Sequence, residues 1–140
     1  MSAEQNKSIV RRWVEEGWNK GNLSVVDQVY APTYVQHEPP PATVTSSEAL
    51  KLYVSGYRTA FPDLHFSIDD LVAENDKVVW RFTSMGTQKG PFMGMPATGK
   101  QGTITGMVMF RFDNSRIVEG WVNIDALGLL QQLGVIPIPG

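Results

Sequence analysis

The chain has 140 residues, of which 42% are hydrophobic, and a formal net charge of -2. This length predicts a single domain, residues 1–140, with enough apolar side chains to bury a core. Twelve basic against fourteen acidic residues give no electrostatic signature for nucleic acid or for an anionic membrane. The absence of cysteine excludes disulfides and thiolate chemistry. Because residues 2–7 are polar and no apolar run approaches the roughly 20 residues of a membrane helix, we expect a cytoplasmic protein with no signal peptide.

Helical patterns open the chain. Residues 3–20 carry apolar side chains at helical spacing, which predicts a helix with one buried stripe. Ser2 and Gln5 are placed to form a capping box at its start, and Gly21 is a natural stop. A shorter helix is expected over residues 23–30.

A third helix is predicted before the chain turns to β patterns. Residues 34–37 form a short extended piece that a proline run ends. Thr45 and Glu48 then predict a second capping box, and the helix that it opens ends at Pro62.

The second half of the chain reads mainly as strands. Four are expected, over residues 65–72, 78–87, 101–112 and 116–125. A Gly/Pro-rich loop over 90–99 carries Phe92, Met93 and Met95 and suits a pocket lid. An amphipathic helix over 126–133 closes the pattern. Helices followed by a long antiparallel meander predict an α+β fold.

Several motifs carry a family resemblance that extends over nearly the whole chain. They are Tyr34-Val-Gln-His37-x-Pro39, Phe61-Pro62-Asp63, the Gly86 to Lys100 glycine-rich segment, Glu119-x-Trp121 with Asp125, and Gly128-x-Leu130-x-Gln132-Leu133-Gly134. Together they resemble the SnoaL-like polyketide cyclases (ester cyclases), a branch of the NTF2-like superfamily. The resemblance implies a cone in which N-terminal helices pack on a strongly curved antiparallel or mixed sheet around a cavity.

The resemblance also implies an activity. We expect a cofactor-independent cyclase or isomerase that acts on an apolar, polyketide-like substrate by acid/base catalysis in a hydrophobic pocket. The alternative is a non-catalytic ligand-binding or carrier module on the same fold. The acid/base aspartate of the cyclases matches Val122 here, and a supporting histidine matches Val108. Any chemistry must therefore come from other residues.

The facing of the last two strands depends on the turn between them. A two-residue turn places Phe112 opposite Ile117, whereas a bulge at Ser115 reverses the parity. We predict the bulge at Ser115, because it joins the apolar sides of both strands into one concave wall. The opposite face then carries Trp121, Met107 and Met109 and suits a homodimer interface.

Two residues are candidates for acid/base catalysis. Asp125 ends the last strand, where it either acts at the cavity mouth or caps the following helix. His37 lies near a strand end, where it either transfers protons at the pocket mouth or stays on the surface. Glu119 is expected in an ion pair with Arg111 or Arg81.

The remaining site residues are expected to bind the substrate, a small apolar organic molecule. Hydroxyl and amide groups would orient a substrate oxygen and aliphatic or aromatic groups would form the wall; these residues are Tyr34, Gln36, Tyr57, Val108, Phe110 and Val122. With two histidines and no cysteine, we expect no metal site, and the sequence contains no cofactor fingerprint.

Overall fold

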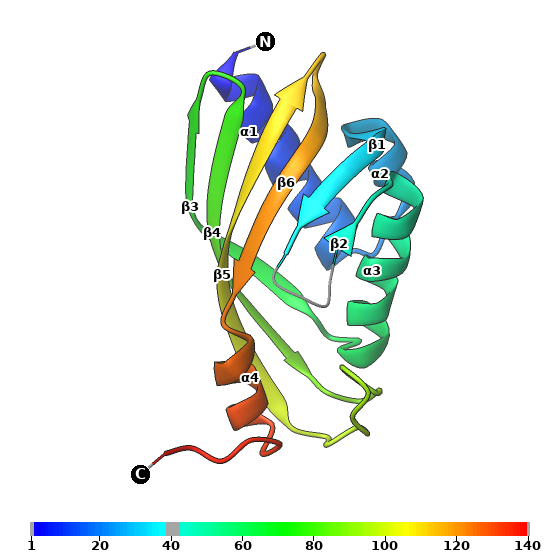
Figure 1. Ribbon diagram of the computed structural model, residues 1–140, viewed down its shortest axis with the longest axis vertical. Helices are drawn as coiled ribbons and strands as arrows, with labels where there is room; N and C mark the ends of the chain where they lie inside the picture. Colours follow the sequence, from blue (N-terminus) through cyan, green and yellow to red (C-terminus); the bar gives the residue numbers. More distant parts are fainter. Residues whose placement is uncertain (1, 39–42, 140) are drawn as a thin grey trace.

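The computed structural model describes residues 2–38 and 43–139 and shows an α+β architecture (Figure 1). Its strands form one curved sheet in the order β2-β1-β6-β5-β4-β3. The pair β1 and β6 is parallel, and the other neighbours are antiparallel. The strands are β1 (Tyr30–His37), β2 (Thr43–Val44), β3 (His65–Glu74), β4 (Lys77–Thr87), β5 (Gln101–Asp113) and β6 (Arg116–Ile124). The predicted fold class is confirmed; Pro39 of the first motif lies outside the described residues.

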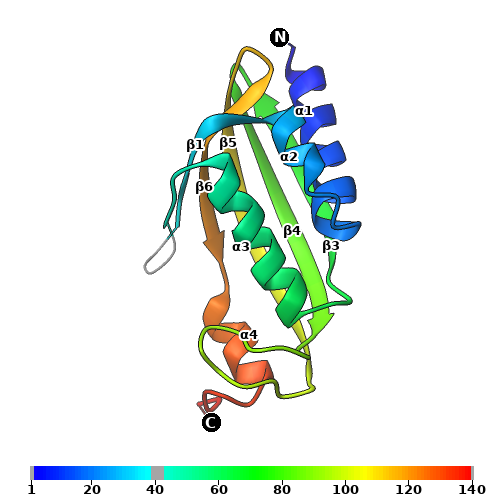
Figure 2. The same cartoon turned by 90° about the vertical axis from the view of Figure 1, so that its right-hand side faces the viewer.

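The helices pack mainly against one face of this sheet (Figure 2). They are α1 (Ala3–Arg12), the π-helix η1 (Trp13–Asn19) that continues it, α2 (Ser24–Val29), α3 (Ser47–Ala60) and α4 (Ala126–Gln132). Helix α1 contacts β3 and β4, η1 contacts β3, and α3 contacts β1, so the core lies between these helices and the concave face. No helix in the described part of the chain is long and apolar enough to cross a membrane.

Side-chain caps begin the two longest helical segments. The capping box at Ser2 and Gln5 is confirmed, with Gln5 N donating to Ser2 Oγ at 3.1 Å and Ser2 N donating to Gln5 Oε1 at 3.0 Å. The capping box predicted at Thr45 is wrong by one residue. Ser46 is the cap of α3 and accepts a hydrogen bond from Ala49 N at 3.0 Å. Only Thr45 has a glutamate three residues later, so the spacing favoured it; Ser46 caps the helix with its hydroxyl alone, without a capping box.

The turn between β5 and β6 differs from the predicted one. Asn114 and Ser115 both have positive φ, 49° and 67°, as the two central residues of a type I′ hairpin turn require. Phe112 therefore pairs directly with Ile117, and the expected bulge at Ser115 is absent.

The parity of β6 is nevertheless reversed, by an irregularity further along the strand. Ile117 pairs with Phe112 and Glu119 pairs with Arg111, so Val118 is an additional residue on β6. Beyond it, the concave face of β6 carries Gly120, Val122 and Ile124. The predicted apolar wall therefore exists, although a different residue produces it. A Cβ on Gly120 would lie 2.3 Å from the Tyr34 hydroxyl oxygen, so glycine leaves the room that the buried Tyr34 side chain occupies.

Candidate functional site

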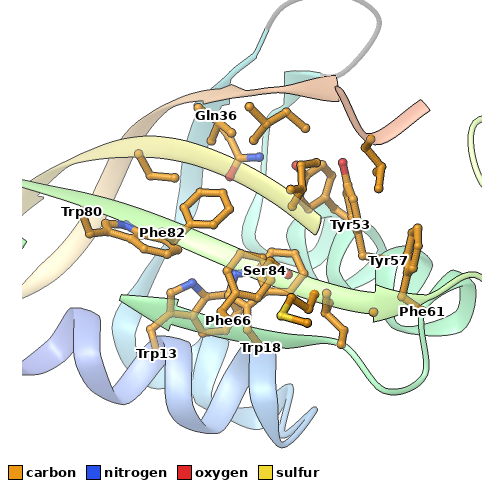
Figure 3. A pocket seen from close by; sticks show the side chains of 18 of the residues that line it. Trp13, Trp18, Gln36, Tyr53, Tyr57, Phe61, Phe66, Trp80, Phe82 and Ser84 are labelled. Carbon is orange, nitrogen blue, oxygen red and sulfur yellow. The ribbon is translucent and has the colours of Figure 1, made fainter. Parts of the chain in front are cut away.

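A largely apolar pocket lies between the concave face and the helices (Figure 3). Aromatic side chains form most of its wall, contributed by η1, α3, β3 and β4; they include Trp13, Trp18, Tyr53, Tyr57, Phe66, Trp80 and Phe82. The far wall comes from β5 and β6. Such a lining fits an apolar organic molecule oriented by a few polar groups.

Ring packing fixes the helical side of the pocket. The ring centroid of Trp18 lies 6.2 Å from that of Tyr53 and 5.9 Å from that of Tyr57, and both tyrosines meet it edge-on. Its distance to the ring centroid of Phe66 is 4.6 Å. Tyr57 also packs against Phe92 of the Gly/Pro-rich loop at 5.4 Å. These contacts hold the rings in preferred aromatic geometries, so this side of the pocket is formed before any ligand binds.

Strand β1 supplies the polar groups of the site. Alternation along the strand turns Tyr34 and Gln36 inward, where both are buried, and directs Glu38 to the same side just beyond the strand end. The Tyr34 hydroxyl donates to Gln36 Oε1 at 2.9 Å, and Gln36 Nε2 donates to Glu38 Oε2 at 3.4 Å. From α3, the Tyr53 hydroxyl donates to Glu38 Oε1 at 3.0 Å. Glu38 is not itself one of the pocket-lining residues, but two of them, Gln36 and Tyr53, hold its carboxylate at the edge of the pocket.

The electrostatics of the site follow from burial. Burial raises the pKa of Glu38 above its ordinary value, although the hydrogen bonds from Tyr53 and Gln36 oppose the shift. Burial, followed by the nearby Glu38 charge, raises the pKa of Tyr57 to about 12. Burial also raises the pKa of Tyr53. At neutral pH both tyrosine hydroxyls stay protonated and can donate hydrogen bonds, while burial makes the Glu38 carboxyl harder to ionise than an exposed one.

The structure brings most of the predicted substrate-binding residues together. Gln36, Tyr57, Val108, Phe110 and Val122 all line the pocket. Tyr34 is fully buried beside them and contacts the pocket through its hydrogen bond to Gln36. Whether these residues bind a substrate remains a prediction.

Of the two positions expected for His37, the pocket mouth and the surface, the structure shows the surface one. Alternation turns its side chain to the convex face of the sheet, where Nε2 lies 2.7 Å from Glu119 Oε2 and the imidazole stacks on Trp121 at 5.5 Å. Arg111 Nε donates to Glu119 Oε1 at 3.1 Å, which confirms the expected ion pair of Glu119 with Arg111. The histidine belongs to this surface cluster on the far side of the sheet from the pocket.

Asp125 occupies the position of a helix cap. Its Oδ1 accepts a hydrogen bond from Gly128 N at 2.9 Å at the start of α4, and the residue is exposed. A Cβ on Gly128 would lie 2.3 Å from Asp125 Oδ2, so a side chain there would make the exposed carboxylate shift. The pocket lining includes its neighbour Ile124 but not Asp125. Of the two expected roles, the structure shows the cap.

Glu38 is the site residue that the sequence reasoning missed. The alternation of the strand could have indicated it, because side chains at 34 and 36 point inward and position 38 continues the same series. The prolines that follow it predicted instead that the strand ends there. Among the described residues, no group of three or more histidine, aspartate or glutamate side chains is placed to hold a metal ion.

The fold defines the general class of the protein, an NTF2-like α+β cone. An ntf2-like protein from Burkholderia pseudomallei has the same fold, with a TM-score of 0.78, 18% identity and coverage of 95% of this chain and 98% of that one. The model of the SnoaL-like polyketide cyclase family matches residues 8–133. The chain therefore belongs to the SnoaL-like polyketide cyclase family, as its motifs predicted.

Two solved structures show the relationship at higher identity. AclR, a candidate hydroxylase from Streptomyces galilaeus, is 31% identical with a TM-score of 0.86, over 99% of this chain and 87% of that one. IdmH, a candidate polyketide cyclase from Streptomyces antibioticus, is 32% identical with a TM-score of 0.82, over 94% of this chain and 99% of that one. No curated protein matches the sequence. The family and these relatives support an enzyme of the cyclase type in general.

The raised pKa of Glu38 predicts a pH-dependent stability. A carboxyl with a higher pKa in the folded than in the unfolded chain stabilises the fold below the ordinary carboxyl pKa, and this contribution is lost as pH rises through the raised value. As pH rises from the ordinary carboxyl pKa through the raised pKa of Glu38, the free energy of unfolding of the wild type should fall relative to that of Glu38→Gln. Urea denaturation at a series of pH values measures the difference.

Glu119→Gln is the control of opposite sign. The His37 hydrogen bond, followed by that from Arg111, lowers the pKa of Glu119. Its stabilising contribution is therefore present above the ordinary carboxyl pKa and is lost as pH falls through the lowered value. Identical pH profiles for the wild type and Glu38→Gln would contradict the assigned environment of Glu38.

Proposed function

We propose that this protein is a cofactor-independent cyclase or isomerase that acts on an apolar, polyketide-like substrate by acid/base catalysis. The observation that carries the proposal is the half-buried Glu38 carboxyl, held by Tyr53 and Gln36 beside an aromatic pocket. A carboxyl with a raised pKa accepts and returns protons nearer to neutral pH than an exposed one does.

The roles of the individual groups follow from their positions. Glu38, as a carboxylate, removes a proton from a carbon beside a substrate carbonyl and returns it to another atom of the same molecule. The Tyr57 hydroxyl, protonated at neutral pH, donates to the carbonyl oxygen on which negative charge develops. Tyr53 and Gln36 hold the carboxylate, and the aromatic wall excludes water and restricts the substrate to a reactive conformer.

Proton exchange into a simple ketone tests the catalytic role without knowledge of the natural substrate. 2-Tetralone is a bicyclic ketone with exchangeable protons beside its carbonyl, and their loss in D₂O is followed by proton NMR. We expect the wild type to accelerate exchange above the buffer rate, and Glu38→Gln to lower the protein-dependent rate by about 10²–10⁴-fold.

Asp125→Asn and His37→Ala are the matched controls. Both residues were candidates from sequence; His37 faces the convex side of the sheet and Asp125 caps α4, so both variants should keep the wild-type exchange rate. Full activity in Glu38→Gln, or its loss in either control, would contradict the assignment of Glu38.

A non-catalytic carrier is the second candidate function, favoured by one observation. Val122 lines the pocket at the position where the cyclases carry their acid/base aspartate. A carrier would show 2-tetralone exchange at the buffer rate together with a rise in melting temperature on binding. A ligand at 100 times its Kd stabilises a fold by about 2.7 kcal/mol.

We also propose that the convex face mediates a homodimer. Met107 is 52% exposed there, beside the partly buried Met109 and Trp121, which makes an apolar patch next to the His37–Glu119–Arg111 cluster. Sedimentation equilibrium at micromolar concentration should show a dimer for the wild type and a monomer for Met107→Glu. Leu52→Glu, an exposed position on α3, should remain dimeric. A monomeric wild type would contradict the proposal.

A further inference from the structure

Two buried polar atoms in the pocket wall have no hydrogen-bond partner among the described residues. They are the Ser84 hydroxyl and the Trp80 indole nitrogen, in side chains that are 1% and 2% exposed. Both residues belong to β4, and both line the pocket (Figure 3). Most buried polar groups in folded proteins are satisfied, so two open ones facing the same pocket need an explanation.

The surroundings of Ser84 favour an apolar side chain. Along the concave face of β4, the inward positions before it are Val78, Trp80 and Phe82. Its cross-strand neighbours are Phe66 on β3 and Ile104 on β5. A hydroxyl in such surroundings loses its water without gaining a protein partner, which destabilises the fold. An aliphatic residue would avoid that loss, so the hydroxyl fits a function in binding.

The location of Ser84 separates it from the reacting end of the pocket. Strands β6 and β5 lie between β1 and β4 in the sheet. Three strand spacings, about 14 Å along the sheet, therefore separate β1, which Glu38 follows, from β4, which carries Ser84. Trp80 precedes Ser84 by four residues, about 13 Å along the strand. An oxygen bound at Ser84 is therefore different from the oxygen next to Glu38.

We propose that Ser84 binds a second oxygen function of the substrate, remote from the group that reacts at Glu38, and that Trp80 offers a further donor to an acceptor oxygen along the same molecule. The ligand class is thus an extended, mainly apolar molecule that carries oxygen functions away from its reacting carbonyl. This inference rests on the proposed function for the position of the reacting end. The Ser84 site itself rests on the geometry of β4.

A matched pair of probes tests the Ser84 site by binding. 6-(4-Hydroxyphenyl)-2-tetralone and 6-phenyl-2-tetralone share the ketone, and only the first carries a hydroxyl, at the far end of the longer biaryl skeleton. Calorimetric titration should show that the wild type binds the hydroxylated probe more tightly. Ser84→Ala should reduce this preference by about threefold to tenfold, the effect of one lost neutral hydrogen bond. Trp80→Phe, tested in the same way, reports on the second donor.

The ligand-free protein supplies a second readout. Because Ser84→Ala removes an unsatisfied buried hydroxyl, its melting temperature without ligand should rise by about 2–8 °C. Ser67→Ala, at an exposed position on the neighbouring β3, should change neither the melting temperature nor the probe preference.

The outcomes separate this inference from the proposed function. No preference for the hydroxylated probe in the wild type, an unchanged preference in Ser84→Ala, or a fall in the melting temperature of the ligand-free variant would overturn the Ser84 site. Failure of Glu38→Gln to slow proton exchange, with the Ser84-dependent preference intact, would overturn the catalytic proposal and leave the binding site in place.

Discussion

Side-chain alternation along β1 is the constraint on which the rest of this site depends. A strand turns successive residues to opposite faces, so Tyr34 and Gln36 face the helices and His37 faces outward. Glu38, just past the strand end, continues the inward series and meets the Tyr53 hydroxyl from α3. A shift of one residue would place the histidine in the pocket and the glutamate on the convex face. Register, more than the presence of particular acidic or basic residues, decides which titratable group lies beside the pocket-lining residues.

The two faces of the curved sheet consequently have different chemistry. The concave face is aromatic and aliphatic, and its polar atoms are few and fixed in place: the Tyr34–Gln36–Glu38 network at one strand and Ser84 at another. The convex face carries the Arg111–Glu119–His37 cluster, in which hydrogen bonds with His37 and then Arg111 lower the pKa of the Glu119 carboxylate. Similar carboxyl groups thus have pKa values shifted in opposite directions, upward where burial dominates and downward where ionic partners dominate.

The sequence predicted the fold class, the family, the order of the α-helices and longer strands and the apolar concave wall, because those depend on periodicity and on motifs spread along the chain; it did not predict the two-residue β2 or the π-helix η1. It did not predict which residue of β6 shifts the register and so turns Gly120, Val122 and Ile124 to the concave face. Asn114 and Ser115 tolerate positive φ and make a two-residue turn, and Val118 then supplies the extra residue, a choice set by packing between strands. It also favoured His37 and Asp125 over Glu38. Residue type alone makes a histidine or a strand-end aspartate look reactive, whereas the hydrogen bond between Glu38 and Tyr53 joins residues 15 positions apart and requires the fold.

The most direct test is a titration of the Glu38 carboxyl carbon by NMR in protein labelled with ¹³C-glutamate, with its signal assigned by its absence from Glu38→Gln. The account predicts that this carboxyl titrates above the other glutamates of the chain, and that substitution of Tyr53 by phenylalanine moves its midpoint further upward, because a hydrogen bond to the charged form is lost. A Glu38 midpoint at or below that of the exposed glutamates would contradict the account, since the carboxyl would then be solvated like any surface acid.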